Sequence, residues 1–355
     1  MKSSISIVTT FFVLIVMVMG TNIQAFSENT TATSGPTFNQ IQAQGLQAIS
    51  ESSNATYGGA SPELKTLFQN QDINASSIPS INTTTTGEER PGSILIDTGD
   101  EQMTDLRLDY EVMGNNSENT PVRQGLFQGD IILTNDKPGA GSKVAPDKFI
   151  TTSKWTNGII PVAIHPDTPN RDHIIDAMAY VMTKIPSLTF RSVEVEDGRI
   201  IDENYLVFYP SDNNCASGLG MEGGAQHIIV PEWCKTGSLV HEIGHTLGLW
   251  HEQTRCDRDE NIRIVWDNIK EEWKSQFTSL CNSDDPSDSP ASFGDYDLCS
   301  IMHYPTSGVT AAIDLNQPIM IPLQEPQGCS VDDIGQRGGY SQLDQEGIKA
   351  LYPIF

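Results

Sequence analysis

The pattern of apolar and polar positions is clearest in the second half of the chain. Residues 155–164, WTNGIIPVAI, carry apolar and β-branched residues at the density of a strand. Residues 204–210, NYLVFYP, and 223–231, GGAQHIIVP, predict two further strands. The segment RDHIIDAMAYVMTKI predicts a helix with one apolar face. That face consists of Ile174, Met178, Val181, Met182 and Ile185.

The first third of the chain has a different pattern. Residues 26 to about 120 are rich in Ser, Thr, Asn, Gln and Gly, hold no Cys and show no sustained apolar period. We therefore expect this stretch to be largely flexible. Before it, Lys2 precedes an apolar run that leads through small and polar residues to Ala25. This predicts a secretory signal peptide over residues 1–25, and hence a secreted product with no stable membrane insertion. An uncleaved anchor is the alternative, but the run is short for a bilayer.

Charge and cysteine content narrow the possible partners. The net charge of −25 makes nucleic acid and anionic membrane surfaces poor partners, so we expect no nucleic-acid binding. An even number of cysteines in an exported protein predicts disulfides. The six are Cys215, Cys234, Cys256, Cys281, Cys299 and Cys329.

The segment HEIGHTLGLWHE, residues 241–252, concentrates metal-binding side chains. On a helix, His241 and His245 share one face, so both imidazoles can reach one ion. Glu242 is rotated by about 100° from His241 and is better placed to act on water than to bind metal. Gly248 can end the helix in a left-handed turn, after which His251 returns as a third ligand.

Three imidazole ligands leave a coordination position open, as in catalytic zinc sites. The segment therefore predicts bound Zn²⁺ that activates water for attack on a peptide carbonyl. Glu242 is the expected general base, which takes the proton of that water and returns it to the leaving amine. Three unrelated histidines on an ordinary helix are the alternative, but the long spacing is a specific signature.

The combination of HEIGHTLGLWHEQTRCDRD with SIMHY, residues 300–304, resembles the astacin family of metzincin endopeptidases. Glu252, directly after the third histidine, is part of that resemblance. It covers roughly residues 150–355 and implies an α+β fold. A twisted mixed sheet and two long helices would lie above the cleft, and an irregular subdomain would lie below it. Protein or peptide substrates are implied as well.

The resemblance also implies roles for single residues. Met302 would form an apolar floor beneath the metal, and Tyr304 would be a further zinc ligand that swings away to stabilise the oxyanion. GGAQHIIV resembles the edge strand above the cleft, which implies substrate binding at Gly224 and Gln226. Arg337 in IGQRGG would lie near the pocket for the residue after the scissile bond and would favour acidic side chains there. A structural ion pair with Asp332 or Asp333 is the alternative.

The cysteines follow the family pattern only in part. Cys215 and Cys234 match a family bridge below the cleft, whereas the cysteines of the other usual bridge are missing from this chain. The remaining four cysteines allow three pairings, of which we expect Cys256 with Cys281 and Cys299 with Cys329. A cysteine ligand to zinc is a competing interpretation of any one of them.

The long amino-terminal segment gains a possible role from the same comparison. LFQGDIIL holds Phe127, Gly129 and Asp130, which resemble the F-x-G-D element of astacin pro-segments. There an aspartate binds the zinc and displaces the catalytic water, so the chain's own pro-segment would be its inhibitor. An ordinary Gly-Asp turn before a strand is the alternative.

We therefore expect residues 1–25 to be a signal peptide, 26–145 an inhibitory pro-segment and 146–355 an astacin-like catalytic domain. The maturation cut should fall between Asp130 and Trp155. The expected function is a secreted zinc endopeptidase made as a zymogen. A catalytically silent binding or adhesion protein on the same scaffold is the main alternative, and a purely structural zinc domain is another.

Overall fold

The computed structural model describes residues 57, 59–81, 93–97, 103–107, 110–115, 121–135, 154–212, 214–280 and 293–354. Contacts divide the chain into the units Met1–Thr37 and Phe38–Phe355, and all described residues belong to the second. The predicted signal peptide lies outside the described residues. Within the described ranges, no helix is both long enough and apolar enough to cross a membrane.

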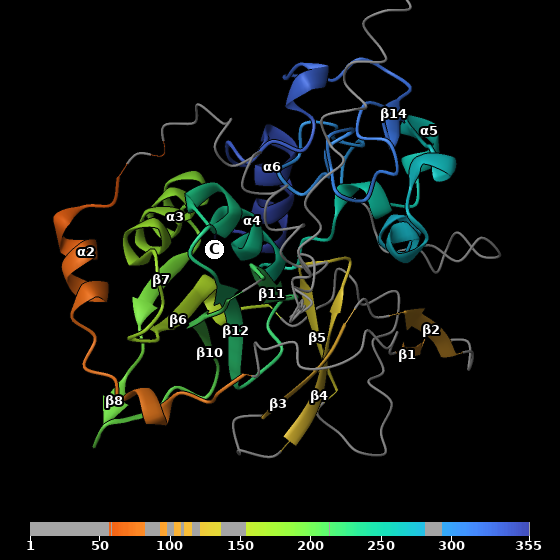
Figure 1. The fold of residues 1–355 in the computed structure, drawn as a ribbon. Helices are drawn as coiled ribbons and strands as arrows, with labels where there is room; N and C mark the ends of the chain where they lie inside the picture. The colour runs from red at the N-terminus through yellow and green to blue at the C-terminus, as the bar shows by residue number, and fades with distance from the viewer. Residues whose placement is uncertain are drawn as a thin grey trace, which may run out of the picture. The chain divides into compact units, whose positions relative to one another are not determined.

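A mixed sheet forms the centre of this unit (Figure 1). Its strand order is β3-β4-β5-β11-β12-β10-β6-β7, and β6, β7, β10 and β12 run parallel. Strand β11 is antiparallel to β12 and parallel to β5. The strands are β3 (Tyr110–Asn115), β4 (Pro121–Phe127), β5 (Ile131–Asn135), β6 (Ile159–Ile164), β7 (Thr189–Ser192), β10 (Tyr205–Pro210), β11 (Ala216–Gly218) and β12 (Ala225–Val230). Thus the predicted pro-segment adds three strands to the sheet of the predicted catalytic domain.

Two long helices pack on one face of this sheet. Helix α3 (Arg171–Lys184) buries Ile174, Met178 and Val181, and α4 (Thr236–Thr246) is buried along its whole length. Their apolar side chains form one core with alternate residues of the strands, such as Val162 and Phe208. The predicted α+β architecture with two long helices is confirmed.

The region after α4 is built from short elements around a second core. They are η4 (Glu252–Thr254), α5 (Arg258–Asn261), β13 (Ile262–Ile264), η5 (Trp266–Asn268), η6 (Glu271–Phe277), β14 (Met320–Pro322) and η8 (Val331–Asp333). The last helix, α6 (Gln342–Leu351), places Ile348 back in the main core. This lower region matches the predicted irregular subdomain.

Disulfides join Cys215 to Cys234 and Cys299 to Cys329, as the sequence analysis expects. Cys256 is also in a disulfide. Its expected partner, Cys281, lies outside the described residues, so that pairing stays a prediction.

The expectation of a largely flexible pro-segment is wrong for residues 59–81. They form α2 (Pro62–Gln69) and η1 (Ala75–Ser77), and Phe68 is fully buried. Strands β1 (Ser93–Asp97) and β2 (Met103–Arg107) form a separate antiparallel pair. Buried apolar residues between Phe68 and Ile81 are too widely spaced to show a period of their own, because they pack on segments far away in the sequence.

The remaining short elements are η3 (Thr156–Gly158), β8 (Val195–Glu196) and β9 (Arg199–Ile200), of which β8 and β9 form a two-stranded pair.

Candidate active site

Helix α4 brings His241, Glu242 and His245 to the base of the sheet. Leu239, Val240 and Ile243 pack in the core and fix the rotation of the helix about its axis. The side chains of His241, Glu242 and His245 are therefore held in fixed directions. Gly248 has a φ of 105° immediately after the helix, in the region that favours glycine. The expected left-handed turn is present, and it returns the chain so that His251 lies beside His241 and His245.

Hydrogen bonds orient the three buried imidazoles. The Nδ1 atom of His241 lies 2.8 Å from the carbonyl oxygen of Ile301, and that of His245 lies 2.7 Å from the oxygen of Leu249. The Nδ1 atom of His251 lies 3.1 Å from Gln128 Oε1. A ring nitrogen beside a carbonyl oxygen must donate, so each Nε2 atom keeps a free lone pair. Burial also lowers the pKa of His241 to about 4, which keeps the ring neutral.

Asp130 faces these lone pairs from the predicted pro-segment. Its carboxylate lies 3.3 Å from His241 Nε2, 3.0 Å from His251 Nε2 and 3.7 Å from His245 Nε2, and only 2 % of the residue is exposed. The chain therefore places a buried carboxylate against three imidazoles.

A tight hairpin turn presents Asp130. Strands β4 and β5 pair up to Phe127 and Ile131. Between them, Gln128 has a φ of 51° and Gly129 a φ of 84°. The glycine accepts that conformation without steric cost. The segment is thus a Gly-Asp turn before a strand, and the turn also aims the carboxylate at the histidine cluster.

The four side chains fit a bound metal ion. Their ligand atoms all lie within 4.8 Å of one another, and all four residues are buried. The Nε2 atoms of His241 and His245 are only 3.1 Å apart, although two lone pairs facing each other repel unless a cation lies between them. Asp130 Oδ1 and His251 Nε2 have no hydrogen-bond partner among the described residues. Imidazole nitrogen and carboxylate oxygen are among the donors that zinc prefers.

Glu242 lies next to this cluster but is not one of its four members. Only 3 % of the residue is exposed, and its Oε2 atom has no hydrogen-bond partner among the described residues. Burial, followed by the charge of Asp130, raises the pKa of the Glu242 carboxyl well above its usual value. A buried carboxyl with an oxygen available is suited to exchange a proton with a substrate or water.

Met302 lies under the helix. A methyl group added at Gly244 would come within 2.8 Å of the Met302 thioether sulfur, so the contact needs a glycine in α4. The preceding carbonyl, that of Ile301, also accepts the hydrogen bond from His241. This turn therefore supports the helix and holds one imidazole in place.

Tyr304 packs its ring against His251, with ring centroids 4.7 Å apart, and its role as a further zinc ligand stays a prediction. Its hydroxyl donates to the backbone oxygen of Gln128, and Gln276 Oε1 lies 3.1 Å away. Sequence reasoning missed both glutamines. Gln128 is the variable position of the F-x-G-D element, and Gln276 lies in an irregular stretch without a recognisable signal.

Arg337 is buried, with 2 % of the residue exposed. Its Nη1 atom donates to the carbonyl of Ile301 at 2.8 Å, while Nη2 has no hydrogen-bond partner among the described residues. Asp332 and Asp333 are exposed, and Asp333 instead accepts hydrogen bonds from Ser330. The guanidinium therefore shares the Ile301 carbonyl with His241, and its Nη2 group is available to donate a further hydrogen bond.

The expectation that Gly224 and Gln226 line the cleft on an edge strand is wrong. Strand β12 lies inside the sheet, between β10 and β11. The Gln226 side chain is used by Glu222 and Gly220 of its own loop. The edge of the sheet in the predicted catalytic domain is β11, because its three residues return antiparallel to β12, and β5 of the predicted pro-segment pairs with it. A three-residue strand has too short a pattern to be recognised in the sequence.

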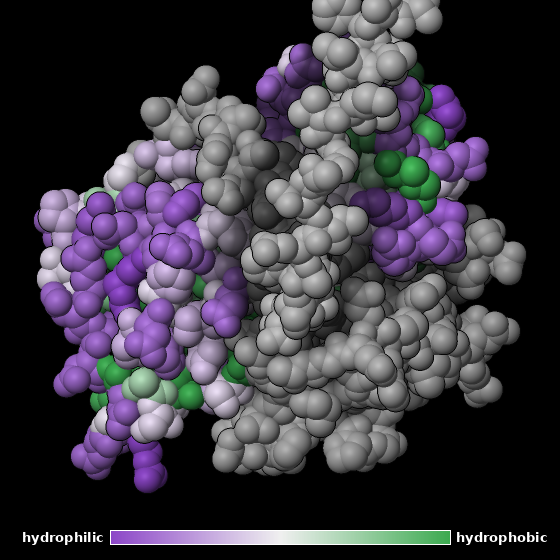
Figure 2. All heavy atoms as spheres, viewed as in Figure 1, coloured by the Kyte–Doolittle hydropathy of each residue, from purple (hydrophilic) through white to green (hydrophobic). Residues whose placement is uncertain are grey.

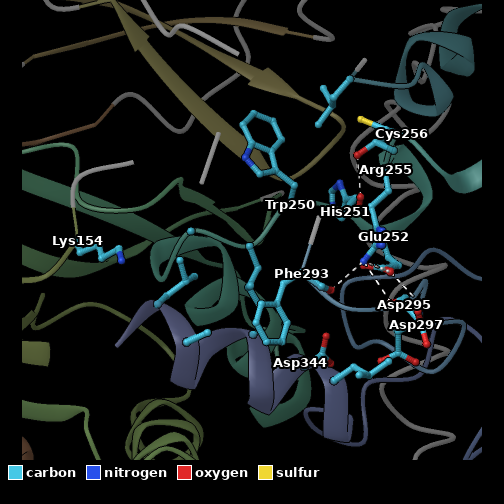
Figure 3. Close-up of a pocket in the computed structure, with 18 residues that line it drawn as sticks. Lys154, Trp250, His251, Glu252, Arg255, Cys256, Phe293, Asp295, Asp297 and Asp344 are labelled. Carbon is cyan, nitrogen blue, oxygen red and sulfur yellow. Dashed lines mark hydrogen bonds and ion pairs between the residues drawn. The ribbon is translucent and has the colours of Figure 1, made fainter. Parts of the chain in front are cut away.

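A cavity of about 360 Å³ is lined in part by His251 (Figure 3). Lys154, Trp250, Glu252, Phe293 and Asp344 contribute to its lining. The Glu252 carboxylate accepts a hydrogen bond from the Asp297 amide at 2.8 Å and lies 3.3 Å from Arg255. The cavity therefore contains a carboxylate that follows the third histidine directly.

Two histidines on a helix, a third after a turn, a neighbouring glutamate and a methionine turn together form the residue set of a metzincin site. The sequence of residues 148–353 matches the astacin family of peptidases. This match covers more than half of the chain, so the protein belongs to the astacin family.

The chain is also similar to individual proteins. The chain is 38% identical over 242 residues to zinc metalloproteinase nas-15 of Caenorhabditis elegans, which covers 64% of this chain and 39% of the relative. It is 30% identical to mouse tolloid-like protein 2 over 74% of this chain and 25% of the relative. It thus spans well under half the length of these two relatives. Among solved structures, high choriolytic enzyme 1, a hatching enzyme zinc-protease from medaka (Oryzias latipes), has 28% identity and a TM-score of 0.46 over 57% of this chain and 94% of its own.

Proposed function

We propose that this protein is a secreted zinc endopeptidase made as a zymogen, with protein or peptide substrates. The observation that carries the proposal is the buried arrangement of three imidazoles around Asp130. Family membership supports the peptidase activity, and the predicted signal peptide supports secretion. A silent binding protein on this scaffold would not need Glu242 beside an intact set of histidines.

In the active form, His241, His245 and His251 would hold the metal. Zinc supplies Lewis acidity there, which makes water more acidic and a peptide carbonyl more electrophilic. The Glu242 carboxylate takes the proton of the attacking water and returns it to the leaving amine. The Tyr304 hydroxyl, once Gln128 has left, is available to donate a hydrogen bond to the oxyanion.

In the precursor, the hairpin of β4 and β5 blocks this chemistry. Asp130 takes the position that water needs, and strand pairing between β5 and β11 occupies the edge where an extended substrate would pair. Gln128 at the same time binds the Tyr304 hydroxyl and the His251 ring. One turn therefore engages the metal site, the oxyanion donor and the ring of one metal ligand.

The maturation cut belongs between Asp130 and Trp155. Trp155 is buried and donates from Nε1 to the Thr246 carbonyl at 2.9 Å, so the folded catalytic domain begins at or before it. The resemblance to astacins implies that Glu252 is tied through water to the new amino terminus. Lys154 and Glu252 line the same cavity, which supports a terminus near that position.

The test measures zinc content and casein cleavage before and after limited proteolysis, with and without a chelator. We expect one zinc per chain in both forms, and cleavage that appears after proteolysis and disappears with the chelator. A proteolysed, folded and zinc-loaded protein without activity would support the silent binding protein instead.

Asp130→Ala tests the inhibitory role of the hairpin. The precursor should then cleave casein, or cut itself, without added protease, because no carboxylate faces the imidazoles. Asp332→Ala, at an exposed aspartate, is the matched control and should stay inactive. An Asp130→Ala precursor as silent as the wild type would remove Asp130 from this role.

A further inference from the structure

Both faces of the central sheet are apolar. Ile160, Val162 and Ile164 of β6 join the core under α3 and α4. The alternate residue Ala163 points to the opposite face. There it lies in a second cluster together with Tyr205 and Val207 of β10. Strands buried on both faces need a covering layer on each.

The predicted pro-segment provides the layer on the second face. Ile73 and Ile78 belong to the same cluster as Ala163, Tyr205 and Val207. Ile81 lies in a neighbouring cluster with Ile229 of β12, and Leu126 of β4 and Ile132 of β5 belong to the same cluster. We call residues 57–81 the strap, which Figure 1 shows in orange, running from α2 beside α3 past β8 towards β10 and β12.

Polar contacts fix the strap to the backbone of the sheet. Gln71 Nε2 donates to the Val162 carbonyl at 2.7 Å, and Gln71 Oε1 accepts from the Ile164 amide at 2.9 Å. The His227 Nε2 atom donates to the Pro79 carbonyl at 2.9 Å. Burial lowers the pKa of His227 to about 4, so this ring donates as a neutral imidazole. The Gln71 amide thus bonds a backbone carbonyl and a backbone amide of β6, as the backbone of a neighbouring strand would.

The first part of the strap is held by α3. Phe68 is fully buried in the main core, and its carbonyl accepts from Arg171 at 2.7 Å. The Ala60 amide donates to Asp176 at 2.8 Å. At the start of the strap, the Tyr57 hydroxyl donates to the backbone oxygen of Arg337. The exposed residues on this side are mostly hydrophilic, as the purple surface in Figure 2 shows, whereas Phe68 points inward.

The strap and the inhibitory hairpin bind in different ways. The hairpin uses Asp130 and Gln128 against the histidine cluster. The strap makes its contacts through Phe68, Ile73 and Ile78 with helix and sheet residues outside that cluster. Removal of the hairpin would open a catalytic cleft, while removal of the strap would expose apolar side chains on the far face of the sheet.

We propose that the strap is a permanent part of the enzyme and stays bound after the hairpin has left. The mature protein then consists of two non-covalently associated chains, because no Cys precedes Cys215. This proposal rests on the proposed function insofar as it assumes a maturation cut after Asp130. It adds that one such cut leaves the hairpin tethered to the bound strap at millimolar effective concentration. Full activation then needs a second cut between Ile81 and Pro121.

The test is a Glu242→Gln precursor with two engineered protease sites, one within residues 82–92 and one within residues 136–153. After both cuts, gel filtration and mass spectrometry identify the pieces that travel with the catalytic domain. We expect the strap piece to co-elute at about one per catalytic domain and the hairpin piece to separate. A folded catalytic domain that elutes without the strap would overturn the proposal.

Two neighbouring residues offer a matched pair of variants. Phe68→Ala removes a fully buried ring. It should shorten the half-life of the complex between strap and catalytic domain, which we call strap retention, by about 100-fold, as expected for loss of a buried aromatic side chain. Leu67→Ala changes a side chain that is 47% exposed and should leave retention within about twofold. If Phe68→Ala fails to fold, Gln71→Ala replaces it, with an expected loss of about tenfold. Equal retention in the Phe68 or Gln71 variant and in Leu67→Ala would contradict the proposal.

Strap retention is measured without catalysis, so this test remains valid even if the protein proves to be inactive. In the wild-type background, the doubly cut form should be at least about tenfold more active than the form cut only within residues 136–153. Equal activity of the two forms would show that the strap does not hold the hairpin in place.

Discussion

The two halves of the active site are built on different physical foundations. The upper half rests on regular elements, the sheet and helices α3 and α4, around one continuous apolar core. The lower half consists mainly of turns and short helices around a smaller core. There, side chains that bind backbone carbonyls replace regular pairing: Asn268 Nδ2 donates to the carbonyls of Asp314, Gln317 and Pro318.

The two halves therefore contribute different kinds of residues to the site. The upper helix supplies His241, Glu242 and His245 on a rigid element, which suits groups that must keep their relative geometry. The lower half supplies Tyr304, whose hydroxyl donates to the hairpin residue Gln128, and Arg337, which donates to the Ile301 carbonyl. We therefore expect substitutions in the upper half to abolish reaction, and those in the lower half to reduce rate, stability or preference.

The largest effect should come from Glu242→Gln in the upper half. We expect proteolysis by the processed enzyme to fall by about 10³-fold or more, because the amide cannot take the proton of the attacking water. Zinc content should stay at one per chain, because Glu242 is not among the four clustered residues. Metal analysis and peptide kinetics check both parts, with the exposed Glu232→Gln as control. Loss of zinc from a folded variant would show that Glu242 is a ligand.

The next effect concerns Tyr304→Phe in the lower half. Removal of the hydroxyl should lower kcat by about 10- to 100-fold, because one donor to the oxyanion is lost while the metal site is kept. KM should change little if this interaction forms mainly in the transition state. Tyr209→Phe, in β10, removes a hydroxyl elsewhere and should leave kcat unchanged. A large rise in KM with normal kcat would instead assign Tyr304 to substrate binding.

Asn268→Ala tests what holds the lower half together. The substitution removes the side chain that binds the carbonyls of Asp314, Gln317 and Pro318, and should reduce the free energy of unfolding by about 1 kcal/mol or more. Asn316→Ala, at an exposed position, should change it by less than about 0.5 kcal/mol. Chemical denaturation of the Glu242→Gln precursor measures both without self-digestion. Equal stability of the two variants would mean that Asn268 does not organise this region.

The smallest effect should be a change in preference by Arg337→Ala. We expect the preference for Asp or Glu directly after the scissile bond to fall by about tenfold, because a guanidinium donor is lost. A peptide library profiled on wild type and variant gives the ratio of acidic to neutral residues, which is independent of enzyme concentration. Arg263→Ala, exposed on β13, serves as control. An unchanged ratio would exclude Arg337 as the specificity residue.

Prediction from the sequence succeeded where contacts are local or periodic. The helix of residues 171–184 follows from its apolar spacing, and the turn at Gly248 follows from the glycine itself. It failed for the strap and for the edge strand β11. The apolar residues of the strap have no period because each meets a different distant segment, and β11 is too short to carry a pattern.

The sequence by itself determined the set of side chains and their spacing on α4, because residues four apart on a helix necessarily share a face. The F-x-G-D resemblance predicted that Asp130 reaches the histidines, 111 residues away from His241, but only the tertiary structure decided that Gln128 binds both Tyr304 and His251. It also decided that residues of the predicted pro-segment cover the second face of the sheet. Contacts between distant segments depend on the packing of whole layers, and local periodicity contains no information about which segment supplies the second layer.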